Sequence, residues 1–343
     1  MVAREAEGGE VGDDRGMSAV DGPDIVAPDG GKMRDLLRVS PGAVDPRTVD
    51  PRSTPGLPAA AGGSRARKAW AREQVELLGA ELGEQQEMLF ATAKAAGEPD
   101  APASAPTTGG AELAPGRPGR VLLVLQAMDC GGKDGTVKRV AGAMNPLGLH
   151  IRSFGPPTEE ELRHDFLWRI RRALPPPGYV GVFNRSHYED VLVARVAELV
   201  PEATWRARYD EINAFEHELV DAGVTLVKVM LHISREEQGE RLLERLTDPR
   251  KHWKYNPSDL DSRARWDDYQ AAYAEALQRC GTESAPWFVV PADRKWYRDW
   301  AVAHLLRETF AGLHLGYPAA GFDVERERDR LRADDEGVKV NGG

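Results

Sequence analysis

The stretch that decides the fold is Arg120-Val-Leu-Leu-Val-Leu-Gln-Ala-Met-Asp-Cys-Gly-Gly-Lys-Asp-Gly-Thr-Val-Lys-Arg139. Its residues 121–125 form an unbroken apolar run, as expected for a strand that is buried on both faces of a parallel sheet. Two glycines and a lysine follow, and the chain then turns helical. The stretch therefore predicts a strand, a glycine-rich turn and a helix, the repeating unit of α/β proteins.

Comparable apolar runs occur at 149–154, 179–183, 224–232 and 286–290, and helical segments separate them. Two capping boxes, Thr158 with Glu161 and Ser234 with Glu237, mark the starts of two of these helices. Strands that alternate with helices predict a doubly wound parallel sheet. In such folds ligands bind at the carboxyl ends of the strands.

The rest of the chain is organised around this core. Residues 1–63 are acidic and rich in Pro and Gly, and we expect most of them to be disordered, although 33–39 could pack locally. A helical extension is predicted over 64–95, with an apolar stripe that includes Trp70, Leu78 and Leu89. A flexible linker over 97–119 follows. The main domain, which includes the helical extension and the linker, spans 64–318, and 319–343 form a C-terminal tail.

The net charge is −10, and residues 1–30 alone contribute −6. The body is therefore close to neutral, which argues against nucleic-acid binding and requires any anion site to be local. The longest apolar run is far shorter than a membrane span, and no secretory signal begins the chain. Two cysteines are too few for a disulfide framework. We expect a cytoplasmic protein with no membrane or nucleic-acid partner.

The loop after the first strand resembles a Walker A loop in its spacing. Ala127 stands where the first glycine is usual, Gly132 and Lys133 match, and Asp134 replaces the hydroxyl residue that normally holds Mg²⁺. Asp129 or Asp134 could supply a carboxylate ligand instead. The predicted phosphate-binding residues are Cys130, Gly131, Gly132, Lys133, Asp134 and Gly135.

A second polar motif follows the strand at 179–183. It contains Asn184, Arg185, Glu189 and Asp190. Arg185, at a strand end beside a phosphate loop, is placed to contact a transferring phosphoryl group. His187 of this motif is expected to have a structural role, because positioning and charge stabilisation carry most of phosphoryl transfer.

A third segment, about 241–260, is predicted to be a basic lid. Its cations are Arg241, Arg245, Arg250, Lys251 and Lys254. Pro249 ends the helix that carries the first two. A mobile basic hairpin opposite a phosphate loop can neutralise phosphates and exclude water. Five cations exceed the need of one triphosphate and suit a longer polyanion.

Together these motifs resemble the polyphosphate kinase 2 family. The resemblance rests on Leu125-Gln-Ala-Met-Asp-Cys-Gly-Gly-Lys-Asp-Gly135, Phe183-Asn-Arg-Ser-His-Tyr-Glu-Asp190, Asp248-Pro-Arg-Lys-His-Trp-Lys254 and Ala285-Pro-Trp-Phe-Val-Val-Pro-Ala-Asp-Arg-Lys-Trp-Tyr297. It implies a P-loop kinase core like that of thymidylate kinase, with a helical lid. It also implies Mg²⁺-dependent, reversible phosphoryl transfer between inorganic polyphosphate and nucleotides.

Carried over by motif, the resemblance makes Asp129, Lys133 and Arg185 the catalytic residues. Asp129 would hold Mg²⁺, for which Mn²⁺ could substitute, with Asp134 or Glu189 as further candidate ligands. The motif with Asn184 is similar to that of the subgroup that phosphorylates both AMP and ADP to give ADP and ATP, and guanine nucleotides stay open. Arg250, Lys251 and Lys254 would be lid cations for polyphosphate.

Two other functions compete with this interpretation. An ATP-dependent nucleoside monophosphate kinase would share the loop, but the cation density of the lid and the missing loop hydroxyl favour polyphosphate. A non-catalytic regulator that binds polyphosphate or nucleotide is disfavoured because Asp129, Lys133 and Arg185 are all present. We also expect a homo-oligomer, and the sequence leaves open whether it is a dimer or a tetramer.

Overall fold

A five-stranded, wholly parallel sheet lies at the centre of the computed structural model, which describes residues 24–40, 45–97 and 119–341. The strands are β1 (Arg120–Gln126), β2 (Leu149–Ser153), β3 (Val180–Asn184), β4 (Val224–His232) and β5 (Trp287–Pro291). Their order across the sheet is β2-β3-β1-β4-β5. All five strands coincide with the predicted apolar runs to within a residue or two, which confirms the doubly wound α/β fold.

The central strand β1 explains why its sequence is apolar without interruption. It pairs with β3 on one side and with β4 on the other, and every one of its residues is buried. Val121 and Leu123 belong to the core on one face of the sheet, while Leu122 and Val124 belong to the core on the other. Because helices cover both faces, neither side of the strand meets water.

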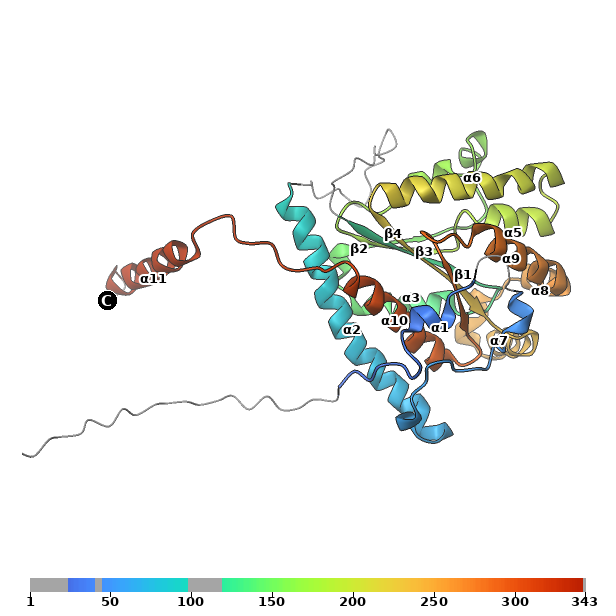
Figure 1. The fold of residues 1–343 in the computed structure, drawn as a ribbon, viewed down its shortest axis with the longest axis horizontal. Coiled ribbons are helices and arrows are strands. Elements are labelled where there is room, and N and C mark those ends of the chain that lie inside the picture. The colour runs from blue at the N-terminus through green and yellow to red at the C-terminus, as the bar shows by residue number, and fades with distance from the viewer. Residues whose placement is uncertain (1–23, 41–44, 98–118, 342–343) are drawn as a thin grey trace, which may run out of the picture.

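The helices form two layers around the sheet (Figure 1). One layer holds α2 (Ser64–Ala95), α3 (Lys133–Arg139) and α10 (Lys295–Ala311), and the other holds α5 (Glu189–Val196), α6 (Glu202–Asp221) and α9 (Trp266–Cys280). The predicted stripe on α2 packs on the core, since Leu78 and Leu89 are buried and Trp70 is partly buried against it. The short helix α4 (Trp168–Arg171) contributes Ile170 to the core that contains Leu122 and Val124.

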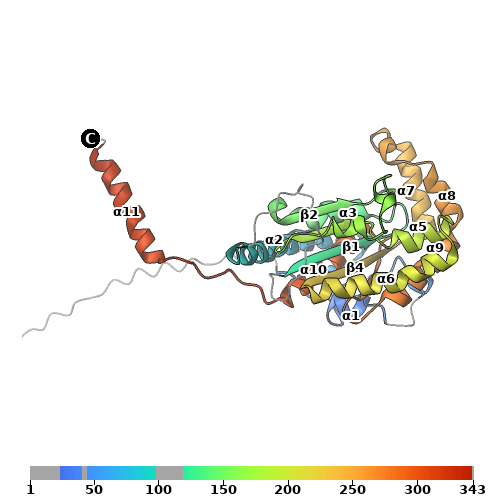
Figure 2. The same cartoon turned by 90° about the horizontal axis from the view of Figure 1, so that it is seen from above.

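The helical lid stands at one end of the molecule in Figure 2. It consists of α7 (Arg235–Thr247), the 3₁₀ turn η6 (Pro249–Lys254) and α8 (Ser258–Ala264). Ser234 caps α7 as predicted by accepting a hydrogen bond from the Glu237 backbone N–H, at 3.1 Å. Pro249 begins η6 directly after α7 has ended, so the predicted helix end is also present.

The other capping box differs from the prediction. Thr158 and Glu161 exchange both expected hydrogen bonds, at 2.8 and 3.2 Å. They nevertheless open only the three-residue 3₁₀ turn η5 (Glu161–Arg163) and not an α-helix. The physical reason is a competing turn, because the Asp165 side chain accepts from the Leu167 N–H just before α4 begins. The two side chains of this capping box accept hydrogen bonds from the Thr158 and Glu161 N–H groups, but no long helix follows.

Within residues 1–63, the segment 33–39, which we expected could pack locally, packs on the core. Helix α1 (Met33–Leu37) packs on α10 and β5, and Met33 is fully buried. Glu308 of α10 accepts hydrogen bonds from the N–H groups of Met33 and Arg34, at 2.7 and 2.9 Å. The sequence did not indicate these partners, because they lie about 270 residues away along the chain.

Three predicted segments lie partly or wholly outside this description. Residues 1–23 of the N-terminal tail and 98–118 of the predicted linker lie outside the described residues. The predicted C-terminal tail contains α11 (Val324–Asn341), which lies apart from the sheet and its helices in both views (Figures 1 and 2). Among the described helices, none is long and apolar enough to cross a lipid bilayer.

Candidate functional site

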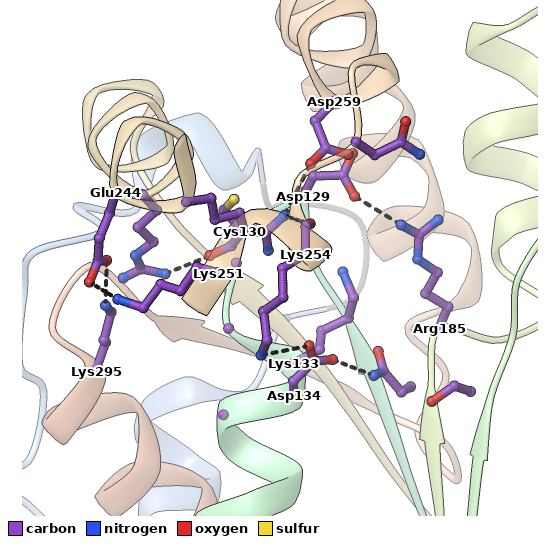
Figure 3. Close-up of a pocket in the computed structure, with 18 of the residues that line it drawn as sticks. Asp129, Cys130, Lys133, Asp134, Arg185, Glu244, Lys251, Lys254, Asp259 and Lys295 are labelled. Carbon is purple, nitrogen blue, oxygen red and sulfur yellow. Dashed lines mark hydrogen bonds and ion pairs between the residues drawn. The ribbon is translucent and has the colours of Figure 1, made fainter. Parts of the chain in front are cut away.

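A cavity of about 570 Å³ opens at the carboxyl ends of β1 and β3, where the fold predicts a ligand. The loop after β1 forms its floor and the lid covers one side (Figure 3). Its lining residues are Asp129, Cys130, Gly131, Gly132, Lys133, Asp134, Gly135, Arg139, Ser153, Phe154, Asn184, Arg185, Arg241, Glu244, Arg245, Lys251, Lys254, Asn256, Asp259, Lys295 and Arg298. The whole predicted phosphate loop is therefore in the cavity wall.

The loop keeps a conformation that only small residues allow. Gly132 has φ +107°, and a Cβ there would lie 1.8 Å from Nη1 of Arg298. At Gly131 a Cβ would lie 2.3 Å from that of Ala127. Cys130 also has a positive φ, 63°, which is uncommon for a residue with a side chain. The glycines are thus required both by backbone torsion and by close packing.

Lys133 is buried at the base of this loop. Its Nζ donates to the backbone oxygen of Ala127, at 2.8 Å. Within the described residues no carboxylate lies within ion-pair distance of Nζ. Burial lowers the pKa of the ammonium, and the nearby Arg185 charge adds to the effect. A bound phosphate could therefore serve as the negatively charged partner of this ammonium group.

Arg185 joins the second motif to the loop. It follows β3 with φ 64°, and its backbone N–H donates to Leu125 O at 3.0 Å. Its guanidinium lies 2.9 Å from Asp129 Oδ1 and 3.2 Å from Glu189 Oε2. These carboxylates, Glu189 foremost, raise the pKa of Arg185 further above its already high value. The structure thus brings Asp129, Lys133 and Arg185 into one cavity.

The remaining residues of the second motif divide into two groups. Asn184 lines the cavity, and its Nδ2 donates to Asp134 Oδ1 at 2.8 Å. The two acids do not line it. Glu189 is turned to Arg185, and Asp190 lies 3.2 Å from Arg208, behind the motif. Burial raises the pKa of Asp190. Asp190 therefore does not reach the candidate site, although the sequence placed it there.

His187 is buried below the same motif, in a network that explains its presence. Its Nε2 lies 3.3 Å from Glu216 Oε1, and Tyr188 donates to the same oxygen at 2.7 Å. The other carboxylate oxygen of Glu216 lies 2.5 Å from Lys228 Nζ on β4. This buried ion pair anchors the motif to the sheet and is consistent with a structural role for His187.

The lid cations do not all face the cavity. Lys251 is paired with Glu244, and Lys254 Nζ lies 3.8 Å from Asp134 Oδ2, so both lie over the loop (Figure 3). Arg250 points away, because its side chain is 89% exposed and pairs with Asp248 at 3.0 Å. Of the five predicted lid cations, Arg241, Arg245, Lys251 and Lys254 therefore line the cavity in this structure and Arg250 does not.

Arg241 and Arg245 line the cavity but are already engaged by the protein. Arg241 is buried and donates to the backbone oxygens of Cys130 and Ala292, at 2.8 and 2.7 Å. It thereby ties the phosphate loop to the end of β5. Arg245 lies 3.1 Å from Asp259 Oδ2 on α8. These two arginines therefore connect the lid to neighbouring segments, and their charges are already engaged by protein groups.

Five further charged residues line the cavity without having been selected from the sequence: Arg139, Glu244, Asp259, Lys295 and Arg298. Asp259 lies next to Asp129 in Figure 3, and burial together with the charge of Asp129 raises its pKa. Arg298 is buried against Gly132 and donates to Asp299 Oδ1 from Nε and Nη2, at 2.9 and 2.7 Å. The sequence offered a signal for Lys295, which lies inside the fourth motif, and for Arg298, which immediately follows it.

The donors for a metal ion are few. Among the described residues, no group of three or more His, Cys, Asp and Glu side chains surrounds a common point. Asp129 and Asp134 each accept one hydrogen bond through Oδ1, from Arg185 and Asn184. Oδ2 of Asp129 accepts no hydrogen bond from the described residues, whereas Oδ2 of Asp134 lies 3.8 Å from Lys254 Nζ. Mg²⁺ is commonly held by one or two carboxylates together with substrate phosphates, and Asp129 fits that mode.

Comparison with known proteins identifies relatives of this arrangement. Residues 114–313 match the family described as Polyphosphate kinase 2 (PPK2). The chain is 53% identical to the AMP/ADP-polyphosphate phosphotransferase of Meiothermus ruber over 199 residues, which are 58% of this chain and 74% of that protein. It is 43% identical to the ADP-polyphosphate phosphotransferase of Rhodopseudomonas palustris over 210 residues, 58% and 73% of the two chains.

A solved structure also matches over most of the chain. The crystal structure of polyphosphate kinase 2 from Arthrobacter aurescens TC1 is similar with a TM-score of 0.78 and 45% sequence identity, over 88% of this chain and 97% of that one. A putative polyphosphate kinase 2 from Pseudomonas aeruginosa is similar with a TM-score of 0.62 and 27% identity, over 79% and 51%. The structural similarity to the Arthrobacter protein therefore extends over most of the chain and is not limited to the residues around the cavity.

Proposed function

The chain belongs to the polyphosphate kinase 2 family, and from this we propose that it transfers phosphoryl groups between inorganic polyphosphate and AMP or ADP, forming ADP and ATP. The observation that carries the proposal is the cavity at the ends of β1 and β3. It gathers Asp129, Lys133 and Arg185 below lid cations, in a chain 53% identical to an AMP/ADP-polyphosphate phosphotransferase.

Lys133 and Arg185 would stabilise the charge of the phosphoryl group during transfer. Little covalent chemistry is required of the protein in such a reaction, so positioning and fixed positive charge do most of the catalysis. In the part of the chain that the structure describes, Lys133 has no carboxylate within ion-pair distance, and Arg185 is held by two carboxylates that fix its direction. Both charges are therefore oriented before the substrate arrives, which is the condition for effective stabilisation.

The lid cations Lys251 and Lys254 would bind polyphosphate by exchanging partners. In the structure they pair with Glu244 and Asp134, and the side chains of both lysines are 36% exposed. Partly exposed ion pairs are worth about 1 kcal/mol or less, so incoming phosphates can displace them. Closure of the lid over the chain would then exclude water from the transfer.

Asn184 would face the nucleotide acceptor. It stands at the end of β3, lines the cavity and carries no charge. An amide does not repel an acceptor phosphate as a carboxylate at the same place would. We therefore expect acceptors of different charge, AMP and ADP, to be used, and guanine nucleotides are to be tested with them.

Mg²⁺, or Mn²⁺ in its place, would be held by Asp129, with substrate phosphates and water completing its ligands. When bound it would neutralise phosphate charge. Asp134 is less suited because Lys254 Nζ lies 3.8 Å from its second carboxylate oxygen, and Glu189 is less suited because it does not line the cavity. The carboxylate of Asp129 keeps one oxygen without a hydrogen bond from the described residues.

The decisive experiment supplies the purified full chain with Mg²⁺ and long-chain polyphosphate, together with AMP or ADP in separate reactions, and resolves the products by chromatography. Formation of ADP and ATP from both acceptors is expected. Parallel reactions with ATP and AMP, but no polyphosphate, test the competing function. Transfer from ATP with none from polyphosphate would make the chain a monophosphate kinase, and binding of polyphosphate without turnover would make it a regulator.

A further inference from the structure

A second cavity adjoins the candidate site and has no part in the function proposed above. Its volume is about 680 Å³, and it lies between the N-terminal half of α2 and the beginning of α10. Arg139 and Lys295 line both cavities, so the two spaces meet at these side chains. Trp296 and Val75 add apolar surface to its wall.

The acids around this second cavity are mostly committed to the protein. Asp293 lies 3.2 Å from Arg52 and also accepts from Ser234, while Asp299 is held by Arg298 and Arg139. Glu237 pairs with Arg241, at 2.7 Å. Their charges are therefore balanced before any ligand arrives.

The cations of the second cavity are available to a ligand. Lys68 and Arg72 are exposed and make neither an ion pair nor a hydrogen bond with any described residue. They stand four residues apart on α2, which places them on one face of the helix. Arg294 donates only to the backbone oxygen of Arg52, so its charge is not neutralised there. Glu76 is the one acid of the lining that is likewise unpaired within the described part of the chain.

We propose that the second cavity binds the distal part of a long polyphosphate chain whose reacting end lies in the candidate site. The inference rests on the proposed function and adds a subsite to it. A linear polyanion longer than the first cavity must leave it, and passage by Arg139 and Lys295 leads to the free charges of Lys68 and Arg72. A nucleotide or a short polyphosphate would end within the first cavity, so its binding would not require Lys68 or Arg72.

The test compares the double variant Lys68→Ala/Arg72→Ala with Lys94→Ala. Lys94 lies on the same helix, is exposed and lines neither cavity, so it controls for loss of charge alone. Steady-state kinetics are measured with long-chain polyphosphate, with linear tripolyphosphate and with ADP, at low and at physiological salt. Melting temperatures are recorded for every variant to establish that each is folded.

The double variant is expected to raise KM for long-chain polyphosphate at least about threefold, since two exposed charge contacts are lost. KM for tripolyphosphate and ADP should stay unchanged, as should all values for Lys94→Ala. The difference should shrink at higher salt because such contacts are screened. Equal effects on long and short donors, an effect on ADP alone or no effect at all would overturn the subsite. Failure of the wild-type chain to use any polyphosphate would instead overturn the proposed function.

Discussion

Replacement of Lys133 by methionine removes a buried positive charge at the base of the phosphate loop while keeping most of the side chain's volume. The ammonium donates to Ala127 O at 2.8 Å and is 3.5 Å from Met128 O. Loss of these hydrogen bonds destabilises the fold, but removal of a buried charge offsets part of the loss. We expect the free energy of unfolding to change by no more than about 2 kcal/mol.

The effect on catalysis should be much larger. No carboxylate among the described residues lies within ion-pair distance of Lys133 Nζ, although the charges of Asp129, Glu189 and Asp134 reach it at longer range. We therefore expect its charge to act directly on the substrate phosphates. Removal of one pre-oriented donor from a site of developing charge typically lowers kcat by about 10²–10³, or about 3–4 kcal/mol. We expect a loss of at least this size, with KM for ADP changed far less.

The assay is ADP-dependent consumption of polyphosphate, followed by chromatography of the ATP formed. Lys138→Met is the control, because Lys138 is exposed on the same helix α3 and lies outside the cavity. A kcat for Lys133→Met within tenfold of wild type, in a folded protein, would refute the assigned role.

The pH dependence of Lys133 gives an independent check. Burial lowers the pKa of its ammonium, and the charged form is the active one. The value of kcat/KM should therefore fall as pH rises through this lowered pKa, below the pH at which an ordinary lysine, with a pKa near 10.4, loses its proton. Lys133→Arg, if active, should lose this alkaline limb because guanidinium stays charged. An unchanged limb in Lys133→Arg would assign it to another group.

Three further changes test other parts of the structure. Asp129→Asn should raise the Mg²⁺ concentration needed for half-maximal rate about tenfold or more, since a charged ligand is lost; the same defect in Asp134→Asn, with none in Asp129→Asn, would transfer the role. Met33→Ala should lower the free energy of unfolding by about 2–5 kcal/mol in denaturant titrations and leave kcat unchanged, because Met33 is fully buried; an unaltered midpoint would mean that α1 does not pack on the core. Lys251→Ala should raise KM for polyphosphate severalfold while Arg250→Ala leaves it unchanged, because only Lys251 lines the cavity; equal effects would show that the lid turns Arg250 inward in the complex.

The sequence determined the framework of the site through local patterns. The apolar run in β1 predicted a central strand because a strand covered by helices on both faces has no polar side to show. Gly132 and Lys133 follow this run at the spacing of a Walker A loop, which predicted a phosphate-binding turn between a strand and a helix. Asn184 and Arg185 were predicted to join them because parallel strands end at one edge of the sheet. Each of these inferences needed only neighbours along the chain.

The tertiary structure alone decided which charges reach the cavity. Arg250 and Lys251 are adjacent in the basic lid, yet only Lys251 lines the cavity. Arg250 is 89% exposed and pairs with Asp248, whereas Lys251 pairs with Glu244 as well as with Asp248. Asp259 enters the site because α8 folds back beside the loop. Composition and spacing cannot distinguish such neighbours, since side-chain direction depends on partners brought together by packing.

The same reason explains the N-terminal segment. Met33 and Leu37 have helical spacing, but they form only one apolar turn in a region rich in Gly, Pro and Asp, so the sequence indicated no more than local packing. It is buried because Glu308, 275 residues further along the chain, accepts its N–H and because α10 and β5 offer an apolar surface to α1. Secondary structure and the order of the motifs can be predicted from local sequence patterns. The burial of a single turn, and the direction of a single charge, depend on contacts that exist only after the chain has folded.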